Sequence, residues 1–216
     1  MVSTIAYQRF YDERRAATEL TRYRARGPTP STRALIEALE AEGVRGATLL
    51  DIGGGIGAIH HELIAAGAAS ATDVDASRPY LDAARAESER RGHADRVSYV
   101  HGDFVELAES IPAADIVTLD RVTNVYPDWE RLTRLAAVRA KRLLGLVYPR
   151  DTAMVALVIR AMNVAFRLRG QEVRAAIRPE REIERIARDA GLQPSSFQNV
   201  GRPWRVAIFR RAQLRQ

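Results

Sequence analysis

Short apolar runs alternate with amphipathic segments along most of this chain. The runs are rich in β-branched and aliphatic residues and are bounded by glycine or proline, which predicts strands. The predicted strands cover residues 47–52, 68–74, 96–102, 114–119, 143–149, 194–200 and 205–211. Helical spacing between them predicts helices over residues 59–66, 78–91, 128–142 and 180–190. This alternation is typical of an α/β protein with a mostly parallel sheet.

Two more helices are predicted before the first strand. They cover residues 3–24 and 31–42, and the helix-breaking sequence RGPTP separates them. In the first helix, aromatic residues recur at intervals that suit one helix face: Tyr7, Phe10, Tyr11 and Tyr23. That face can close over a binding pocket as a lid, or it can pack against the edge of the sheet.

The length of 216 residues suits a single α/β domain. Within it we expect an N-terminal helical cap over 1–45, a core over 46–150, an insertion over 151–178, and a final helix and hairpin over 179–216. The chain has no cysteine, so disulfides and thiolate catalysis are excluded, and its first residues lack the layout of a signal peptide. The sequence therefore predicts a cytoplasmic protein.

The net charge of +6 comes almost entirely from arginine, because Lys141 is the only lysine. The arginines are spread along the chain with acidic residues between them, whereas nucleic-acid surfaces usually gather Lys and Arg on one face. The charge pattern therefore favours a solvated surface and argues against a nucleic-acid partner.

The sequence GGGIG after Asp51 places four glycines in five positions, where a predicted strand passes into a predicted helix. Gly53, Gly55 and Gly57 allow a sharp turn and the close approach of a ligand, and the N-terminus of the next helix offers free N–H groups. A tight turn without a ligand is the alternative. One glycine pattern, G-x-G-x-x-A, resembles a dinucleotide site. Asp51 argues against that interpretation, because a carboxylate repels pyrophosphate but suits a ligand with cationic groups.

With its acid included, the loop resembles the first motif of the class I S-adenosylmethionine-dependent methyltransferases. Later segments are similar to further motifs of the same family, in the same order: TDVDAS, HGDF, ADIVTLD and the closing PSSFQNVGRPWRVAIFRR. The resemblance covers residues 47–210. It implies a doubly wound, seven-stranded sheet that is mostly parallel with a C-terminal antiparallel hairpin, and S-adenosyl-L-methionine as the cofactor.

The resemblance also implies roles for residues at the strand ends. Asp75, about twenty residues beyond the glycines, is placed to accept both ribose hydroxyl protons. Asp103 and Phe104 are implied to recognise the adenine amine and to pack its ring, and Asp120 lies where methyl donor and acceptor meet. The expected cofactor-binding residues are Asp51, Gly53, Gly54, Gly55, Gly57, Asp75, Ala76, Asp103, Phe104 and Asp120.

Structural roles compete for several of these acids. Asp103 can cap the turn that follows it, and Asp120 can pair with Arg121 or Arg150. Asp73 and Asp75 flank Val74, and only one of them can face the ribose. Asp75 is favoured, and Asp73 can instead be a solvated residue at the end of the strand.

Methyl transfer from a sulfonium is a displacement with an already activated donor, so it needs alignment, exclusion of water and, at most, removal of one proton. Candidate proton acceptors at strand ends are His101, Tyr126 and Tyr148. His60 and His61 are expected on the surface or in a helix cap instead. No cluster of residues has metal-ligand spacing, so we expect catalysis without a metal.

The insertion over 151–178 is unusually apolar and is expected to contribute to the acceptor site. Arg160 and Asn163 interrupt it, so it does not predict a membrane span. It is either a buried helix or a hydrophobic wall, formed by Met154, Leu157, Val158 and Met162, beside Arg167, Arg169, Arg174 and Arg178. Such a wall suits a flat or apolar acceptor with carboxylates, and the layout loosely resembles the magnesium-protoporphyrin methyltransferases.

The sequence thus predicts a methyltransferase that acts on a small molecule, with O-methylation favoured. Three alternatives remain. An RNA or DNA methyltransferase would share the cofactor site, but DRVTNVYPD stands where the Asn/Asp-Pro-Pro-aromatic motif for base methylation would be. A nicotinamide-dependent oxidoreductase is disfavoured by Asp51. A protein that binds the cofactor without catalysis would show binding but no product.

Overall fold

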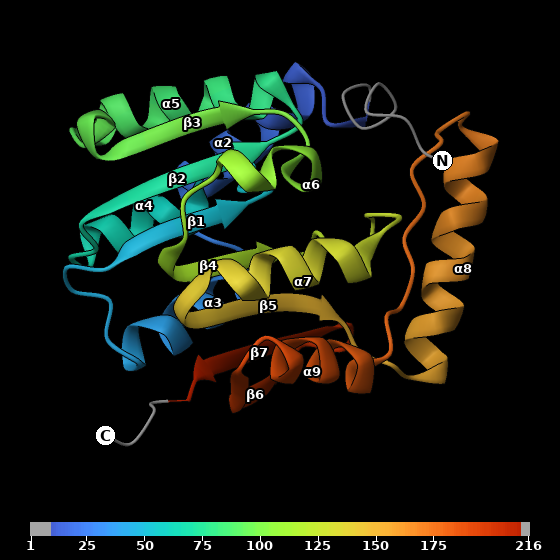
Figure 1. Cartoon of the computed structure of the whole chain (residues 1–216). Coiled ribbons are helices and arrows are strands. Elements are labelled where there is room, and N and C mark those ends of the chain that lie inside the picture. Colours follow the sequence, from blue (N-terminus) through green and yellow to red (C-terminus); the bar gives the residue numbers. More distant parts are fainter. Residues whose placement is uncertain (1–9, 213–216) are drawn as a thin grey trace.

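The computed structural model describes residues 10–212, which form a seven-stranded sheet between helices (Figure 1). The strand order is β3-β2-β1-β4-β5-β7-β6; β7 runs antiparallel to both of its neighbours, and the other pairs are parallel. The strands are β1 Thr48–Ile52, β2 Ser70–Asp75, β3 Val97–His101, β4 Ala114–Asp120, β5 Ala140–Pro149, β6 Leu192–Val200 and β7 Trp204–Arg211. The predicted sheet and its antiparallel C-terminal hairpin are therefore confirmed.

Helices cover both faces of the sheet and divide the core into two layers. One layer buries α3 (Pro30–Ala41) and α4 (Ala58–Ala65) against β1, β4 and β5. The other layer buries α6 (Phe104–Leu107), α7 (Trp129–Arg139) and α9 (Glu180–Asp189) against the opposite face of the sheet. The strands in the middle are apolar on both faces, as expected for parallel strands between two helix layers.

Two more helices, α2 (Glu13–Arg26) and α5 (Arg78–Arg91), pack against each other near the β3 edge of the sheet. Ser77 caps α5 as predicted, accepting a hydrogen bond from the backbone N–H of Tyr80. The prediction of one continuous helix over residues 3–24 is wrong, because Asp12 is non-helical and caps α2 by accepting from the N–H of Arg15 at 2.9 Å. Tyr7 lies outside the described residues.

The helix predicted over 128–142 ends earlier, at Arg139. From Ala140 onward the chain pairs with β4 and then with β7, and these ladders take residues whose spacing also suits a helix. Packing on the sheet therefore decides where α7 stops.

The 151–178 segment forms α8 (Ala153–Leu168) and most of the connection that follows it, residues 169–179. This connection, called the strap below, returns toward α9. In Figure 1, α8 lies beyond the ends of β1, β4 and β5, apart from the other helices. Only Val155 of α8 is buried, so the alternative of a buried helix is wrong. The Asn163 side chain joins helix and strap, donating to the carbonyl of Ala175 at 2.7 Å and accepting from its N–H at 3.0 Å. Of the helices within residues 10–212, none has the length and apolar character needed to cross a membrane.

Candidate functional site

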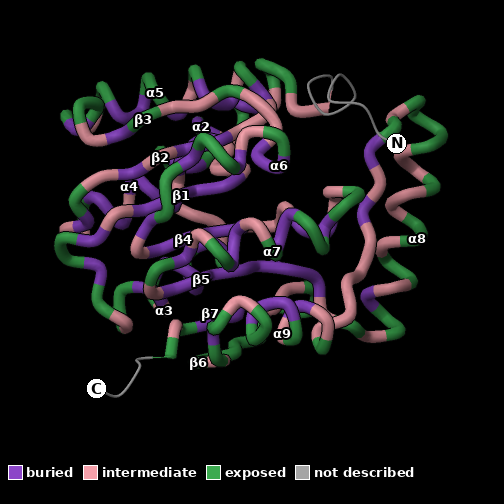
Figure 2. Tube along the Cα trace, in the orientation of Figure 1, coloured by how far each residue is buried: buried purple, intermediate pink, exposed green. Residues whose placement is uncertain are grey.

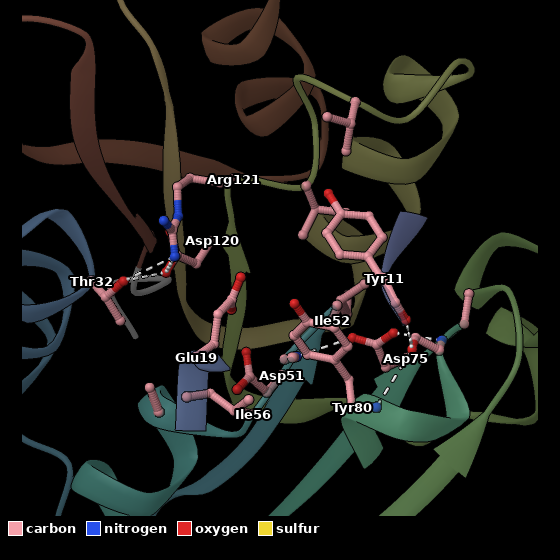
Figure 3. Close-up of a pocket in the computed structure, with 18 of the residues that line it drawn as sticks. Tyr11, Glu19, Thr32, Asp51, Ile52, Ile56, Asp75, Tyr80, Asp120 and Arg121 are labelled. Carbon is pink, nitrogen blue, oxygen red and sulfur yellow. Dashed lines mark hydrogen bonds and ion pairs between the residues drawn. The ribbon is translucent and has the colours of Figure 1, made fainter. Parts of the chain in front are cut away.

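A cavity of about 420 Å³ opens at the carboxyl ends of β1, β2 and β4. Residues from α2, the glycine loop, the loop after β4 and α8 line it. In Figure 3, Tyr11, Tyr80 and Asp75 lie on one side, Thr32, Asp120 and Arg121 on the other, with Glu19 and Asp51 between them. The volume is within the usual range for a small-molecule site.

The glycine loop turns directly from β1 into α4. Gly53, Gly55 and Gly57 have φ of 65°, 61° and 81°, which only glycine adopts without strain. The N–H of Gly53 donates to the carbonyl of Val74 at 2.7 Å and joins the loop to β2. A Cβ on Gly54 would collide with the carboxylates of Asp51 and Asp73 below it. The loop therefore presents its backbone to the cavity with no side chain in between.

Asp75, at the end of β2, supports this loop while it lines the cavity. Its carboxylate accepts hydrogen bonds from the N–H of Gly55 at 3.0 Å and of Ser77 at 2.7 Å. Burial raises the pKa of Asp75 to about 6, and Asp51 adds to this rise, while the two N–H groups oppose it. Ala76, the next residue, also lines the cavity.

This raised pKa predicts that affinity for a ligand with ribose hydroxyls depends on pH. The ionised carboxylate accepts two hydroxyl protons, so affinity should be constant above about pH 7 and fall by up to about tenfold per pH unit below about pH 6. Because the folded pKa lies above the ordinary 3.8, protonation of Asp75 should meanwhile stabilise the ligand-free fold as the pH falls through 6. Calorimetric titration across this range, with Asp75→Asn as the control that removes both effects, tests the assignment.

Asp103 lies beside the same cavity with two hydrogen-bonding partners. It caps α6 by accepting from the N–H of Val105 at 2.8 Å, as the alternative interpretation predicted. The hydroxyl of Tyr126 lies 2.9 and 2.8 Å from its two carboxylate oxygens and donates to them. Phe104 is buried next to it and lines the cavity. The cap thus orients Asp103 without removing it from the site.

Beneath the glycine loop, two acids and a histidine are buried together. Asp51 accepts from the hydroxyl of Thr118 at 2.7 Å through Oδ1. Its Oδ2 lies 3.4 Å from Nδ1 of His60 and has no hydrogen-bond partner among residues 10–212. Asp73 is fully buried beside them, so the alternative of a solvated residue at the strand end is wrong. Burial, and then Asp51, raise the pKa of Asp73 well above its usual range.

The expectation that His60 and His61 lie on the surface or cap a helix is also wrong. Both imidazoles are fully buried below Gly57, because the glycine loop leaves room there for rings rather than for Cβ atoms. His61 lies 3.0 Å from Nε2 of His93 and 3.2 Å from the carbonyl of Ile56. Burial lowers the pKa of His61 to about 2, so its ring is neutral and acts as packing.

Asp120 pairs with its neighbour, as the structural alternative for this acid predicted. Nε of Arg121 lies 3.0 Å from Oδ1 of Asp120, and the hydroxyl of Thr32 donates to Oδ2 at 2.6 Å. Arg121 has φ of 61°, which is uncommon for a residue other than glycine. The ion pair and the strained backbone hold both side chains at the cavity wall.

The three predicted proton acceptors are not brought together. Tyr126 lines the cavity. His101 is exposed at the end of the edge strand β3, with Nε2 3.1 Å from the carbonyl of Ala76, and it does not line the cavity. Tyr148 is fully buried in the core and does not line the cavity either, and its hydroxyl has no hydrogen-bond partner among the described residues.

A row of four packed aromatic side chains covers one side of the cavity. The rings of Tyr80 and Tyr11 pack edge to face at 5.7 Å, Tyr11 packs on Phe10 at 4.9 Å, and Phe10 on Phe166 of α8 at 5.3 Å. The hydroxyl of Ser77 donates to the carbonyl of Tyr11 at 2.7 Å. Phe10 and Tyr11, two of the four aromatic residues predicted to face the pocket or the sheet edge, thus connect the Asp75 turn with α8.

Sequence reasoning missed several other lining residues, among them Arg15, Glu19, Thr32, Tyr80 and Trp204. They come from four separate elements and belong to no motif, and only Tyr80 carried a local signal, three residues after the Ser77 cap. Within residues 10–212, no group of three or more histidine, aspartate or glutamate side chains has a geometry that could hold a metal ion.

Comparison with known proteins adds a family match over part of the chain. Residues 49–142 match the family described as "Methyltransferase domain". No curated protein matches the chain. A similar solved structure is the magnesium protoporphyrin IX methyltransferase from Synechocystis PCC 6803 with bound SAH, with 21% identity, a TM-score of 0.69, and coverage of 84% of this chain and 82% of that one.

Two further similar structures are larger proteins. An O-methyltransferase family protein from Burkholderia thailandensis has 20% identity and a TM-score of 0.70, covering 93% of this chain and 60% of that one. Mitomycin 7-O-methyltransferase has 27% identity and a TM-score of 0.64, covering 84% and 54%. The stretch that matches the family contains the glycine loop, Asp75, Asp103 and Asp120, whereas α2, α3 and α8 lie outside it.

Proposed function

We propose that this chain is a class I S-adenosylmethionine-dependent methyltransferase that methylates an oxygen atom of a small-molecule acceptor and needs no metal ion to do so. The family match over residues 49–142 and the similar structures with bound SAM or SAH support the first part of this proposal. The observation that carries the proposal is the cover of the cavity. Residues of α2 and α8 line it together with the glycine loop, so the reacting groups meet in a space of about 420 Å³ rather than on an open surface. A covered site of this size suits a small acceptor better than a nucleic acid.

The residues at the floor of the cavity fit the cofactor chemically. We propose that Asp75 and Ala76 hold the ribose, Asp103 and Phe104 hold the adenine, and the bare backbone of Gly53, Gly54, Gly55 and Gly57 leaves room for the chain between ribose and amino acid. Asp51 supplies a buried carboxylate oxygen, Oδ2, that lacks a hydrogen-bond partner within the part of the chain that the structure describes. Such an oxygen suits an ammonium group and opposes a phosphate. When bound, the cofactor supplies an activated methyl group.

The chain's own contribution is to align the reactants and exclude water. The row of aromatic side chains from Tyr80 to Phe166 closes one side of the cavity, and the Asp120–Arg121 ion pair fixes the opposite wall. Arg15, Arg22 and Arg121 line the cavity and favour an acceptor with an anionic oxygen such as a carboxylate. An oxygen that is already deprotonated needs no general base, which agrees with the placement of His101 and Tyr148 outside the cavity.

The chemical identity of the product tests this proposal directly. Purified protein is incubated with labelled cofactor and a panel of hydroxyl, carboxyl and amine acceptors, and labelled products are identified by mass spectrometry. Treatment with mild base then separates methyl esters, which it cleaves, from ethers and N-methyl products. We expect an O-methylated small molecule and an unchanged rate in EDTA. Transfer only to RNA or to nitrogen, or complete loss of transfer in EDTA, would refute it.

Tyr126 is predicted to orient Asp103 rather than to accept a proton, because its hydroxyl is engaged by that carboxylate. Tyr126→Phe should weaken cofactor binding by about tenfold, near the lower end of the effect of one hydrogen bond to a charged group because the contact acts through Asp103, with little change in kcat. Tyr148→Phe is the matched control, since its hydroxyl is buried without a partner and its loss should change neither quantity. A large fall in kcat at unchanged affinity in Tyr126→Phe would instead make this tyrosine the proton acceptor.

A further inference from the structure

The outer face of α8 is apolar although it faces solvent. Its large side chains are strongly exposed: Met154 47%, Leu157 67%, Val158 60%, Val164 59% and Leu168 83%. Together with the exposed Ala161, which fills the gap between Val158 and Val164, these positions lie on one side of the helix and form a single stripe along it. Figure 2 shows the exposed positions of α8 on the side away from the sheet. A solvent-facing helix normally carries polar residues there, so this stripe indicates a surface that contacts another molecule or a membrane.

Positive charge borders this apolar stripe. Arg160 and Arg167 are exposed and seven residues apart, nearly two helical turns, so they share one margin. Arg169 is exposed one residue beyond the helix, eleven residues after Val158, at the other margin. α8 itself contains no acidic residue. At the N-terminal end, Nη1 of Arg202 from the β6–β7 turn lies 4.0 Å from the sulfur of Met154.

We propose that α8 is an interfacial helix that docks the protein on an anionic lipid surface. An apolar stripe between arginine margins places aliphatic side chains at the acyl boundary while the guanidinium groups reach the headgroups. The helix has 16 residues and thus about 24 Å of length to lie along such a surface. This proposal is independent of the acceptor.

Charge and composition favour lipid over a protein partner. In a symmetric pair of α8 helices the arginine margins of the two copies would face each other and repel, whereas anionic headgroups neutralise both margins. The stripe has only methionine, leucine, valine and alanine, and it lacks the aromatic anchors that dominate protein interfaces. A flat, fluid surface suits it better than a shaped pocket.

The inner side of α8 ties the helix to the rest of the protein. Val155 is buried, Asn163 bonds the strap at Ala175, and Phe166 contacts Phe10. The stripe can therefore enter an interface without unfolding the contacts that line the cavity.

Flotation with lipid vesicles tests the proposal on the full chain. We expect binding to vesicles of phosphatidylcholine mixed equally with phosphatidylglycerol, much weaker binding to phosphatidylcholine alone, and release as salt rises. Leu157→Gln with Leu168→Gln should weaken binding on the order of tenfold or more, and Arg160→Gln with Arg167→Gln on the order of tenfold. The control is Val138→Gln, which changes another strongly exposed apolar residue (60%), on α7, and should leave binding unchanged.

Circular dichroism and cofactor calorimetry verify that each variant is folded. Absence of binding to anionic vesicles, or equal binding by wild type and the double leucine variant, would overturn the proposal. A wild-type dimer in sedimentation that becomes a monomer in the double leucine variant would also overturn it, because the stripe would then belong to a second copy of the chain.

Discussion

Replacement of Asp75 by alanine is expected to weaken cofactor binding by about one to two orders of magnitude. We place the ribose at this carboxylate, where two charge-assisted hydrogen bonds would be lost together. The same carboxylate accepts from the N–H of Gly55, so its removal also loosens the loop that must face the ligand. Calorimetric titration with the demethylated cofactor measures the effect without turnover.

The matched control for this variant is Asp115→Ala at the opposite end of the sheet. Asp115 also accepts from a backbone N–H, that of Thr48 at 2.8 Å, and from the hydroxyl of the same residue at 2.9 Å. Its loss should lower the free energy of unfolding and leave cofactor affinity unchanged. If Asp75→Ala behaves in the same way as Asp115→Ala, the ribose has been assigned to the wrong acid.

Substitution of Gly57 by alanine should destabilise the fold by about 2–4 kcal/mol, which is large for a single methyl group. Its φ of 81° is unfavourable for alanine by about 1–2 kcal/mol. The added Cβ would also collide with the ring of His60 and lie 2.7 Å from Nε2 of His61. Both rings are fully buried, so neither can move aside without disturbing its neighbours.

Gly92→Ala separates the two contributions. Gly92 ends α5 with a similar φ of 75°, but a Cβ there would have no atom within 4 Å. It should therefore show only the backbone cost of about 1–2 kcal/mol. Urea unfolding of both variants gives the difference, and equal losses would mean that the histidines do not pack under the loop as described.

The strands and the glycine loop could be predicted because their signals are local. Period and turn residues identify each strand, and parallel strands bring their carboxyl ends to one edge, so Asp51, Asp75, Asp103 and Asp120 were expected to meet. All four line the same cavity. Local pattern also predicted the caps at Ser77 and Asp103.

Features that depend on neighbours in space could not be read in the same way. His101 follows the strand pattern as Asp75 does, but β3 is at the edge of the sheet, so the residue is exposed. His60 and His61 are polar residues that were expected near the surface. The absence of side chains in the glycine loop leaves the space in which their rings are buried. For α8, the apolar composition was clear, but which of its faces would be covered depends on the strap and on Phe10.

The cavity's two groups of lining residues come from different parts of the chain. Those assigned to the cofactor lie within residues 49–142, whereas α2, α3 and α8 contribute from outside that stretch. Mutations in the flanking helices can therefore change which acceptor is admitted while cofactor recognition is conserved. The two properties can therefore evolve separately. An engineer could exchange the flanking helices between enzymes while keeping the same cofactor-binding core.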